Sequence, residues 1–269
     1  MRGTWSVDDR SHGAPLGAGG RYACDPRAGR RQPVLAVSRR VRALMRIGIV
    51  TALAAEARTL PAAGGHMFEH DEFLLALAGP GPAPAAAAAE RLRARGCDAL
   101  ISWGVAGALA PTLGAGDLIV ASRVIGAQGA SADCDPALRQ ALHQRLATAS
   151  VMSGALYSSA HAIATASAKA ELFRDYDCAA VDMETIAIAM VASRHGLAFA
   201  ALRAVVDNAR FDLPSAAMVG MGEHGETRTL ATLRQLLMHP WELLDLARLA
   251  WCYRSALQAL RDAGRRLCH

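Results

Sequence analysis

Three acidic residues stand where the sequence predicts the ends of buried strands. Glu56 follows the apolar run Arg46–Thr51, Glu184 lies in the segment V-D-M-E-T, and Asp207 ends the longest of the predicted buried strands. A carboxylate is costly to remove from water without a partner, and burial raises its pKa so that it can hold a proton near neutral pH. These three groups are therefore the candidates for acid–base chemistry.

Each acid also has a purely structural interpretation. Glu56 can be a solvated glutamate in the first turn of a helix, where the helix dipole favours negative charge. Asp182 can cap the helix that follows Glu184. Asp207 can be a cap, or it can form an ion pair with Arg210. The sequence leaves these alternatives open.

Two glycine-containing segments are candidates for close contact with a ligand. Gly79–Pro84 (G-P-G-P-A-P) is placed between a strand and a helix, where a phosphate-binding turn would lie. Its three prolines have no backbone N–H, which argues against a dinucleotide-binding loop and hence against a nicotinamide-dependent enzyme. Gly104–Gly107 is interpreted as a turn whose backbone can approach a ligand. His161 and Tyr157 are further candidates to line a pocket.

The elements that must position these residues alternate between strands and helices from Met45 onward. Strands are predicted at Arg46–Thr51, Phe73–Ala78, Ala99–Trp103, Leu118–Val124, Ser153–Ser159, Ala179–Asp182 and Ala198–Val206. Helices are predicted around Glu56, from Pro84 to Arg95, and at Pro136–Ala149, Ala166–Tyr176, Thr185–His195 (ending at Gly196), Thr227–Leu237 and Trp241–Arg261. This alternation predicts a three-layer α/β/α sandwich with a mainly parallel mixed sheet. In such folds, sites lie at the carboxyl ends of strands, where all the candidates fall.

Charge separates the first 44 residues from the rest. Nine of the 29 basic residues and three of the 24 acidic residues fall there, which leaves 20 basic and 21 acidic residues in 45–269. The folded part therefore gives no reason to expect a nucleic-acid partner. We interpret residues 1–44 as a disordered basic extension, with Met45 as a candidate natural start, and residues 45–269 as a single domain.

The six cysteines are scattered, with no C-x-x-C pair. No metal, other cofactor or disulfide scaffold is expected from such spacing. The absence of a long uncharged apolar window argues against a membrane-spanning helix, and we expect a cytoplasmic protein.

Four motifs in order carry a family resemblance. They are M-R-I-G-I-V-T-A-L-A-A-E from Met45, G-V-A-G-A-L-A-P-T-L-G-A-G-D-L-I-V from Gly104, V-D-M-E-T-I-A-I-A from Val181 and R-A-V-V-D-N-A from Arg203. Over about Met45–Val206 the chain resembles the superfamily of purine nucleoside phosphorylases and methylthioadenosine/S-adenosylhomocysteine nucleosidases. The resemblance implies their fold, no cofactor, and a homo-oligomer.

The resemblance also implies a role for each carboxylate. Glu56 is similar to the glutamate that activates the attacking water in the nucleosidases. Glu184 is similar to the glutamate that binds ribose hydroxyls, and Asp207 to the aspartate that protonates purine N7. An acid near N7 helps because a purine leaves poorly as an anion. The predicted substrate-binding residues are Gly79, Gly81, Gly104, Val105, Ala106, Gly107, His161, Asp182 and Met183, the last packing against the sugar.

Other features narrow the expected subgroup. Ala78 replaces a serine of the nucleosidase loop, and the prolines that follow put transfer to phosphate in doubt. Met218–His224 and Pro240–Leu244 resemble the hopanoid-associated phosphorylases, a group held to release adenine from adenosylhopane. We therefore expect cleavage of the N-glycosidic bond of a purine nucleoside, by phosphorolysis or hydrolysis.

The lipid tail of adenosylhopane would need an apolar contact. Helix Trp241–Tyr253 offers one for the tail or for a membrane surface, unless this face packs on the sheet or on a second subunit. The alternatives to adenosylhopane cleavage are a methylthioadenosine/S-adenosylhomocysteine-type nucleosidase and a non-catalytic nucleoside-binding module.

Overall fold

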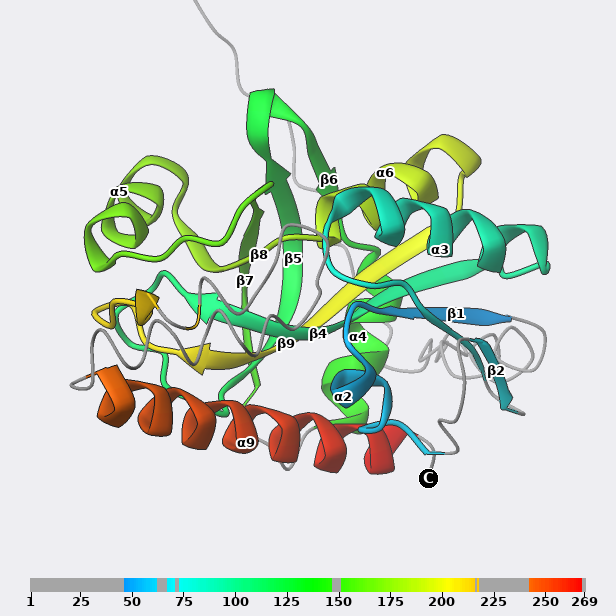
Figure 1. The fold of residues 1–269 in the computed structure, drawn as a ribbon. Helices are drawn as coiled ribbons and strands as arrows, with labels where there is room; N and C mark the ends of the chain where they lie inside the picture. Colours follow the sequence, from blue (N-terminus) through cyan, green and yellow to red (C-terminus); the bar gives the residue numbers. More distant parts are fainter. Residues whose placement is uncertain are drawn as a thin grey trace, which may run out of the picture. The chain divides into compact units, whose positions relative to one another are not determined.

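The computed structural model describes residues 46–61, 67–70, 73–146, 151–215, 217 and 242–267 (Figure 1). The chain divides into residues 1–42 and 43–269, and every element below belongs to the second unit. The predictions for residues 1–44, Met218–His224 and Thr227–Leu237 lie outside the described residues, as does the end of the helix predicted at Pro136–Ala149.

The described strands form one mixed sheet in the order β2-β3-β1-β4-β8-β7-β5-β6, with β9 paired to β4 and β5. Their bounds are β1 Ile47–Thr51, β2 Met67–His70, β3 Phe73–Leu77, β4 Ala99–Ala108, β5 Leu118–Gly126, β6 Ser131–Asp133, β7 Val151–Ser158, β8 Cys178–Asp182 and β9 Ala198–Asp207. β1 is parallel to β3 and β4, and β4 is parallel to β9. The predicted mainly parallel mixed sheet is confirmed.

Five of the strands close into a ring. β4 pairs with β9, β9 with β5, β5 with β7, β7 with β8, and β8 returns antiparallel to the end of β4. At the point of closure Gly107 pairs with both Val181 and Asp207. The ring therefore brings the ends of β4, β8 and β9 together, although they are far apart in the sequence.

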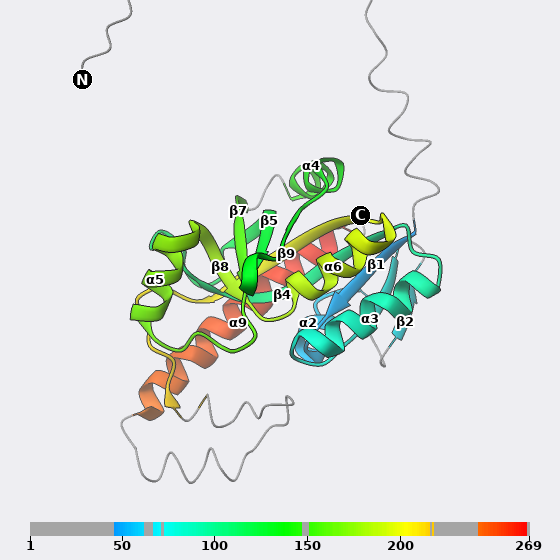
Figure 2. The same cartoon turned by 90° about the horizontal axis from the view of Figure 1, so that it is seen from above.

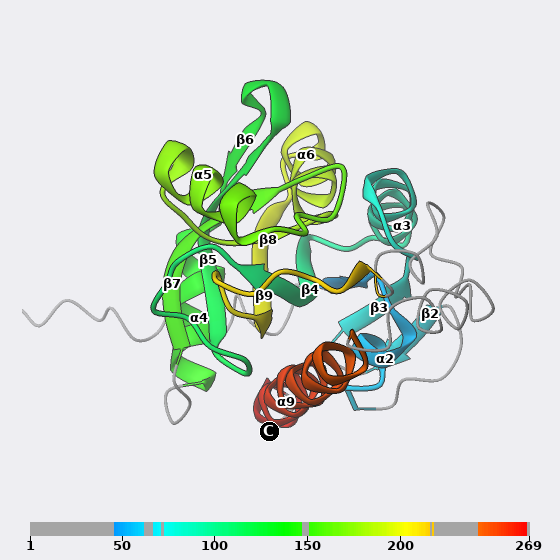
Figure 3. The ribbon, with the colours of Figure 1, turned by 60° about the vertical axis from the view of Figure 1, so that its left-hand side comes forward.

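Helices cover both faces of the sheet, as the three-layer prediction requires. α3 (Pro82–Ala94) and α6 (Thr185–His195) lie side by side on one face (Figures 1 and 2). α2 (Ala54–Ala57), α4 (Pro136–Arg145) and α9 (Glu242–Leu267) lie on the other (Figure 3). α5 (Ala166–Tyr176) packs beside β8 over a smaller apolar cluster.

The two main faces of the sheet each have a core that explains these contacts. Ala85, Ala88 and Ala89 of α3 are fully buried, and their small side chains let the helix backbone lie close to the sheet. On the opposite face, Ala256, Leu260 and Ala263 bury the C-terminal half of α9. The N-terminal half of α9 instead leaves Leu243 and Trp251 exposed, at 57% and 67% of their surface. In the described part of the chain, no helix has the length and apolar character to cross a membrane.

The turn predicted at Gly104–Gly107 is wrong, because β4 continues to Ala108. These residues pair in parallel with β9, with a register shift between Ala106 and Gly107. Glycine usually signals a turn, but inside a strand it also marks a bulge or a close approach of other atoms. Two short antiparallel strands, β2 and β6, were not predicted. The C-cap at Gly196 is confirmed by its left-handed φ of 63°.

Candidate active site

Glu56 is held by the backbone on both sides of its carboxylate. Oε2 accepts hydrogen bonds from the N–H groups of Ala52 (3.1 Å) and Leu53 (2.9 Å), in the turn between β1 and α2. Oε1 accepts one from Val105 in β4 (2.9 Å). A Cβ at Gly104 would lie only 2.6 Å from Oε1, so a side chain here would displace the carboxylate from these hydrogen bonds. Burial raises the pKa of Glu56, and the Arg203 charge and these hydrogen bonds oppose the rise.

Glu184 lies between β8 and α6. Its Oε1 accepts a hydrogen bond from Gly81 N–H (2.8 Å) in the loop before α3. Gly81 and Gly79 have φ of +95° and +99°, values that residues with a side chain rarely adopt. Burial, followed by the negative charge of Asp182, raises the pKa of Glu184 to about 7. Near neutral pH this carboxyl group is thus divided between its two protonation states.

Arg203 supplies the positive charge of the site from within β9. Its guanidinium is 3% exposed and donates to Asp182 Oδ2 (2.8 Å), Ser102 Oγ (2.6 Å) and Thr185 Oγ1 (2.6 Å). Thr185 also donates its hydroxyl to Asp182. Asp182 was predicted to bind substrate, but its carboxylate already accepts hydrogen bonds from Arg203 and Thr185. Arg203 was not predicted as a site residue, although an arginine in an otherwise apolar strand was a usable signal.

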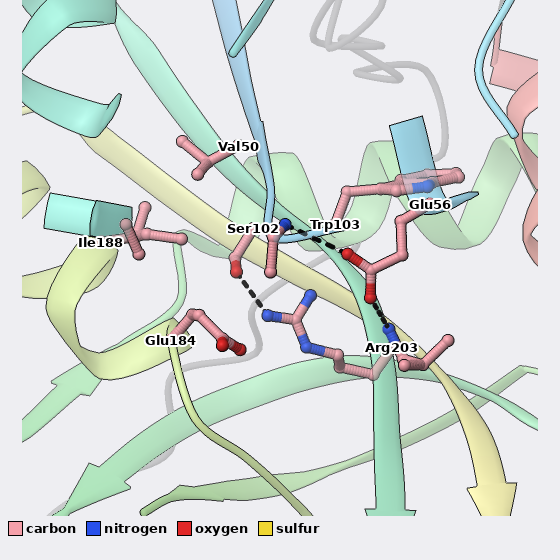
Figure 4. Close-up of a pocket in the computed structure, with 10 residues that line it drawn as sticks. Val50, Glu56, Ser102, Trp103, Glu184, Ile188 and Arg203 are labelled. Carbon is pink, nitrogen blue, oxygen red and sulfur yellow. Dashed lines mark hydrogen bonds between the residues drawn. The ribbon is translucent and has the colours of Figure 1, made fainter. Parts of the chain in front are cut away.

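Glu56, Glu184 and Arg203 face a common pocket (Figure 4). Its walls are completed by Val50, Ala52, Ala85, Ser102, Trp103, Val105 and Ile188. Two carboxylates outnumber the one guanidinium, whose charge is already balanced by Asp182. Such a pocket can accept hydrogen bonds from hydroxyl groups and can stabilise a developing positive charge.

Asp207 lies at the end of β9, against Gly107 of β4, and is not among the residues that line this pocket. Its Oδ2 forms a buried ion pair with Lys169 of α5, and not with Arg210. A Cβ at Gly107 would lie 3.0 Å from Oδ1, so this carboxylate also rests against a glycine of β4. Burial raises the pKa of Asp207 above its usual value, while the Lys169 ammonium opposes the rise.

A family model described as the phosphorylase superfamily matches residues 46–237. The chain belongs to the phosphorylase superfamily. Among curated proteins, none matches it.

Solved structures share the fold of this superfamily member at low sequence identity. Futalosine hydrolase of Helicobacter pylori has a TM-score of 0.63 and 16% identity over 83% of this chain and 97% of its own. A methylthioadenosine/S-adenosylhomocysteine nucleosidase of the same organism has a TM-score of 0.57 and 18% identity, over 81% and 97%. S-adenosylhomocysteine nucleosidase of Streptococcus pyogenes has a TM-score of 0.57 and 23% identity, over 72% and 96%.

Of the other residues predicted to bind substrate, some lie at the pocket and others do not. Val105 lines the pocket and donates its N–H to Glu56, and the partly buried Met183 directly precedes Glu184. Ala106 is buried in β4 between the two glycines. His161 is exposed and donates its backbone N–H to Ser159, while Tyr157 packs in the cluster beneath α5, 4.8 Å from the Tyr176 ring.

Proposed function

We propose that this protein cleaves the N-glycosidic bond of a purine nucleoside with water as the acceptor. The observation that carries the proposal is the pocket in which Glu56, Glu184 and Arg203 face one another, with Glu56 against Gly104 and Asp207 against Gly107 of the same strand, β4. Membership of the phosphorylase superfamily supports it. So do the names of two structures of similar fold, a futalosine hydrolase and a nucleosidase.

The proposed roles follow from the charges. Glu184 accepts hydrogen bonds from ribose hydroxyls, and the two pocket carboxylates stabilise the positive charge that develops on the sugar. Asp207 gives a proton to N7 of the base as the bond between C1′ and N9 breaks. The water oxygen bonds to C1′, and Glu56 takes the proton that the water loses. A positioned acid or base of this kind contributes about 10²–10⁴-fold to the rate.

Water is favoured over phosphate by the loop before α3. Its N–H groups at Gly79 and Gly81 are already donated to Ala52 O (3.1 Å) and to Glu184 (2.8 Å). Pro80, Pro82 and Pro84 have none to donate. An incoming phosphate would also meet two carboxylates and an arginine already paired with Asp182. Each ionised carboxylate makes the pocket a poorer site for phosphate than for neutral water.

Within this proposal the substrate is adenosylhopane, an adenine nucleoside with a lipid tail. The motif resemblance to hopanoid-associated phosphorylases supports it, as does the exposed apolar half of α9 with Leu243, Leu244 and Trp251. Burial, followed by the charge of Glu56, raises the pKa of Tyr253 in α9 to about 12. α9 also contacts α2 and β4, the elements that carry Glu56 and Val105. A nucleosidase for methylthioadenosine or S-adenosylhomocysteine would need no such surface.

The test is to incubate the full-length protein with adenosylhopane, methylthioadenosine and S-adenosylhomocysteine, with and without phosphate, in water enriched in ¹⁸O. We expect adenine release that does not need phosphate, and ¹⁸O in the sugar product. A sugar 1-phosphate would refute hydrolysis, and preference for the two smaller nucleosides would refute the lipid-tailed substrate. Binding without cleavage of any purine nucleoside would indicate a binding module.

A further inference from the structure

Lys169 is the one residue of α5 that the structure buries completely, at 1% exposure. A helix that packs on a sheet normally buries apolar side chains, and a buried ammonium is costly unless it is paired. All three donor positions of this ammonium are used. Nζ donates to Asp207 Oδ2, to Phe211 O (2.8 Å) and to Asn208 O (3.3 Å). The lysine thus ties α5 to the carboxylate and to the segment that follows it.

The two oxygens of Asp207 have different surroundings. Oδ2 is bound by Lys169, whereas Oδ1 lies against the bare backbone of Gly107 in β4. The other charged side chains near Asp207 contact groups other than its carboxylate. Asp212 accepts the Ala166 N–H at the start of α5 (2.6 Å). The backbone N–H of Arg210 donates to Asn208 Oδ1 (3.0 Å), and the Arg248 guanidinium of α9 lies over the Phe211 ring (5.2 Å).

We propose that Lys169 is a positioning residue for Asp207, which fixes the carboxylate through Oδ2, leaves Oδ1 for the purine, and balances the charge that remains after proton transfer. The inference rests on the proposed role of Asp207 as the acid. The physical reason is that a buried carboxylate produced during the reaction is unstable without a partner. A fixed ammonium stabilises it without any reorganisation. The same ammonium also limits how far burial raises the pKa of Asp207.

The direction of the effect on pH dependence follows from the charge. Asp207 must be protonated to act, so kcat/KM falls as the pH rises through its pKa. An opposite charge in contact lowers the pKa of an aspartate by about 1–3 units. Replacement of Lys169 by methionine should therefore move the alkaline limb of kcat/KM upward by about 1–3 pH units. The maximal kcat should fall at least about tenfold, because the carboxylate produced is no longer balanced.

The experiment compares the pH profiles of full-length wild type, K169M, K169R and D212N, with thermal melts of each. K169R retains the charge and should keep the wild-type limb. D212N loosens the attachment of α5 without touching Asp207 and should also keep it. A lower kcat with an unmoved limb in K169M would mean a structural role and overturn the proposal. Wild type without nucleoside cleavage would instead overturn the proposed function.

A second measurement covers the case in which K169M does not fold. Loss of the Asp207 charge in D207N should shift the ¹³Cε resonance of labelled Lys169, because the ammonium loses its ionic partner. A Lys169 resonance that is the same in wild type and D207N would overturn the electrostatic role.

Discussion

Replacement of Glu184 by glutamine should stabilise the substrate-free protein, and the gain should grow with pH. Glutamine has nearly the same shape, and its amide oxygen can still accept the Gly81 N–H that Glu184 accepts at 2.8 Å. What it removes is a carboxylate whose pKa is raised from 4.5 to about 7 by burial and by Asp182. The folded wild-type chain therefore resists ionisation of this group more than the unfolded chain does.

The pH window follows from the two pKa values. Below pH 4.5 the group is protonated in both states and makes no difference to stability. Between pH 4.5 and about 7 only the unfolded chain ionises, so wild-type stability falls as the pH rises. Above that range the raised pKa of Glu184 destabilises folded wild type by its full amount, about 3 kcal/mol for a shift of this size. Solvent screening makes this an upper value, because Glu184 is partly exposed.

Urea unfolding at pH 5 and pH 8 measures the effect. We expect E184Q to exceed wild type by about 1 kcal/mol at pH 5 and by about 3 kcal/mol at pH 8, with equal m-values. E90Q is the matched control, because Glu90 is a surface glutamate whose pKa is lowered, chiefly by a hydrogen bond with His195. It should show no gain at pH 8. An E184Q gain that is the same at both pH values, or absent at pH 8, would refute the reasoning.

Three further predictions concern activity. kcat/KM should fall as the pH drops below about 7, because Glu184 must be ionised to accept ribose hydroxyls. The E184Q variant should lack this fall at acid pH. If E184Q still shows it, the fall is due to another group. Glu56→Gln and Asp207→Asn should each lower turnover by about 10²–10⁴-fold with nucleoside binding retained in calorimetry; full activity in either variant would remove that residue from the mechanism. Gly104→Ala should displace the Glu56 carboxylate, because the new methyl group would lie 2.6 Å from it. Turnover should fall at least about tenfold, and the free energy of unfolding measured in urea should fall by about 1–3 kcal/mol. A variant with unchanged turnover and stability would contradict the close contact.

The sequence predicted the layers and the positions of the acids well, because these depend on local patterns. Apolar runs that end in Asp182 and Asp207 identify strand ends, and Gly196 identifies a helix end. The partners of the acids could not be predicted in the same way. Lys169 meets Asp207 across 38 residues, and the contact exists only because the ring of strands brings α5 to the end of β9.

The glycines of β4 were recognised but misinterpreted for a related reason. Glycines at positions 104 and 107 indicate that a side chain does not fit there, but they do not show which atoms fill the space. A turn, a ligand and a buried carboxylate all produce the same sequence. Only the tertiary structure, in which α2 and the end of β9 lie against β4, shows that the neighbouring groups are Glu56 and Asp207. The short β2 and β6 have too few residues to show an alternating pattern at all.

The contact of two carboxylates with the bare backbone of β4 limits how this protein can diversify. A methyl group at Gly104 or Gly107 meets a carboxylate oxygen at 2.6 or 3.0 Å, so a substitution there displaces Glu56 or Asp207. Leu244 of α9 is 80% exposed and free of that constraint. A library randomised over this half of α9 should remain rich in folded members with altered substrate range. The same library built at the two glycines should be depleted of active members, which makes β4 the fixed element and α9 the evolvable one.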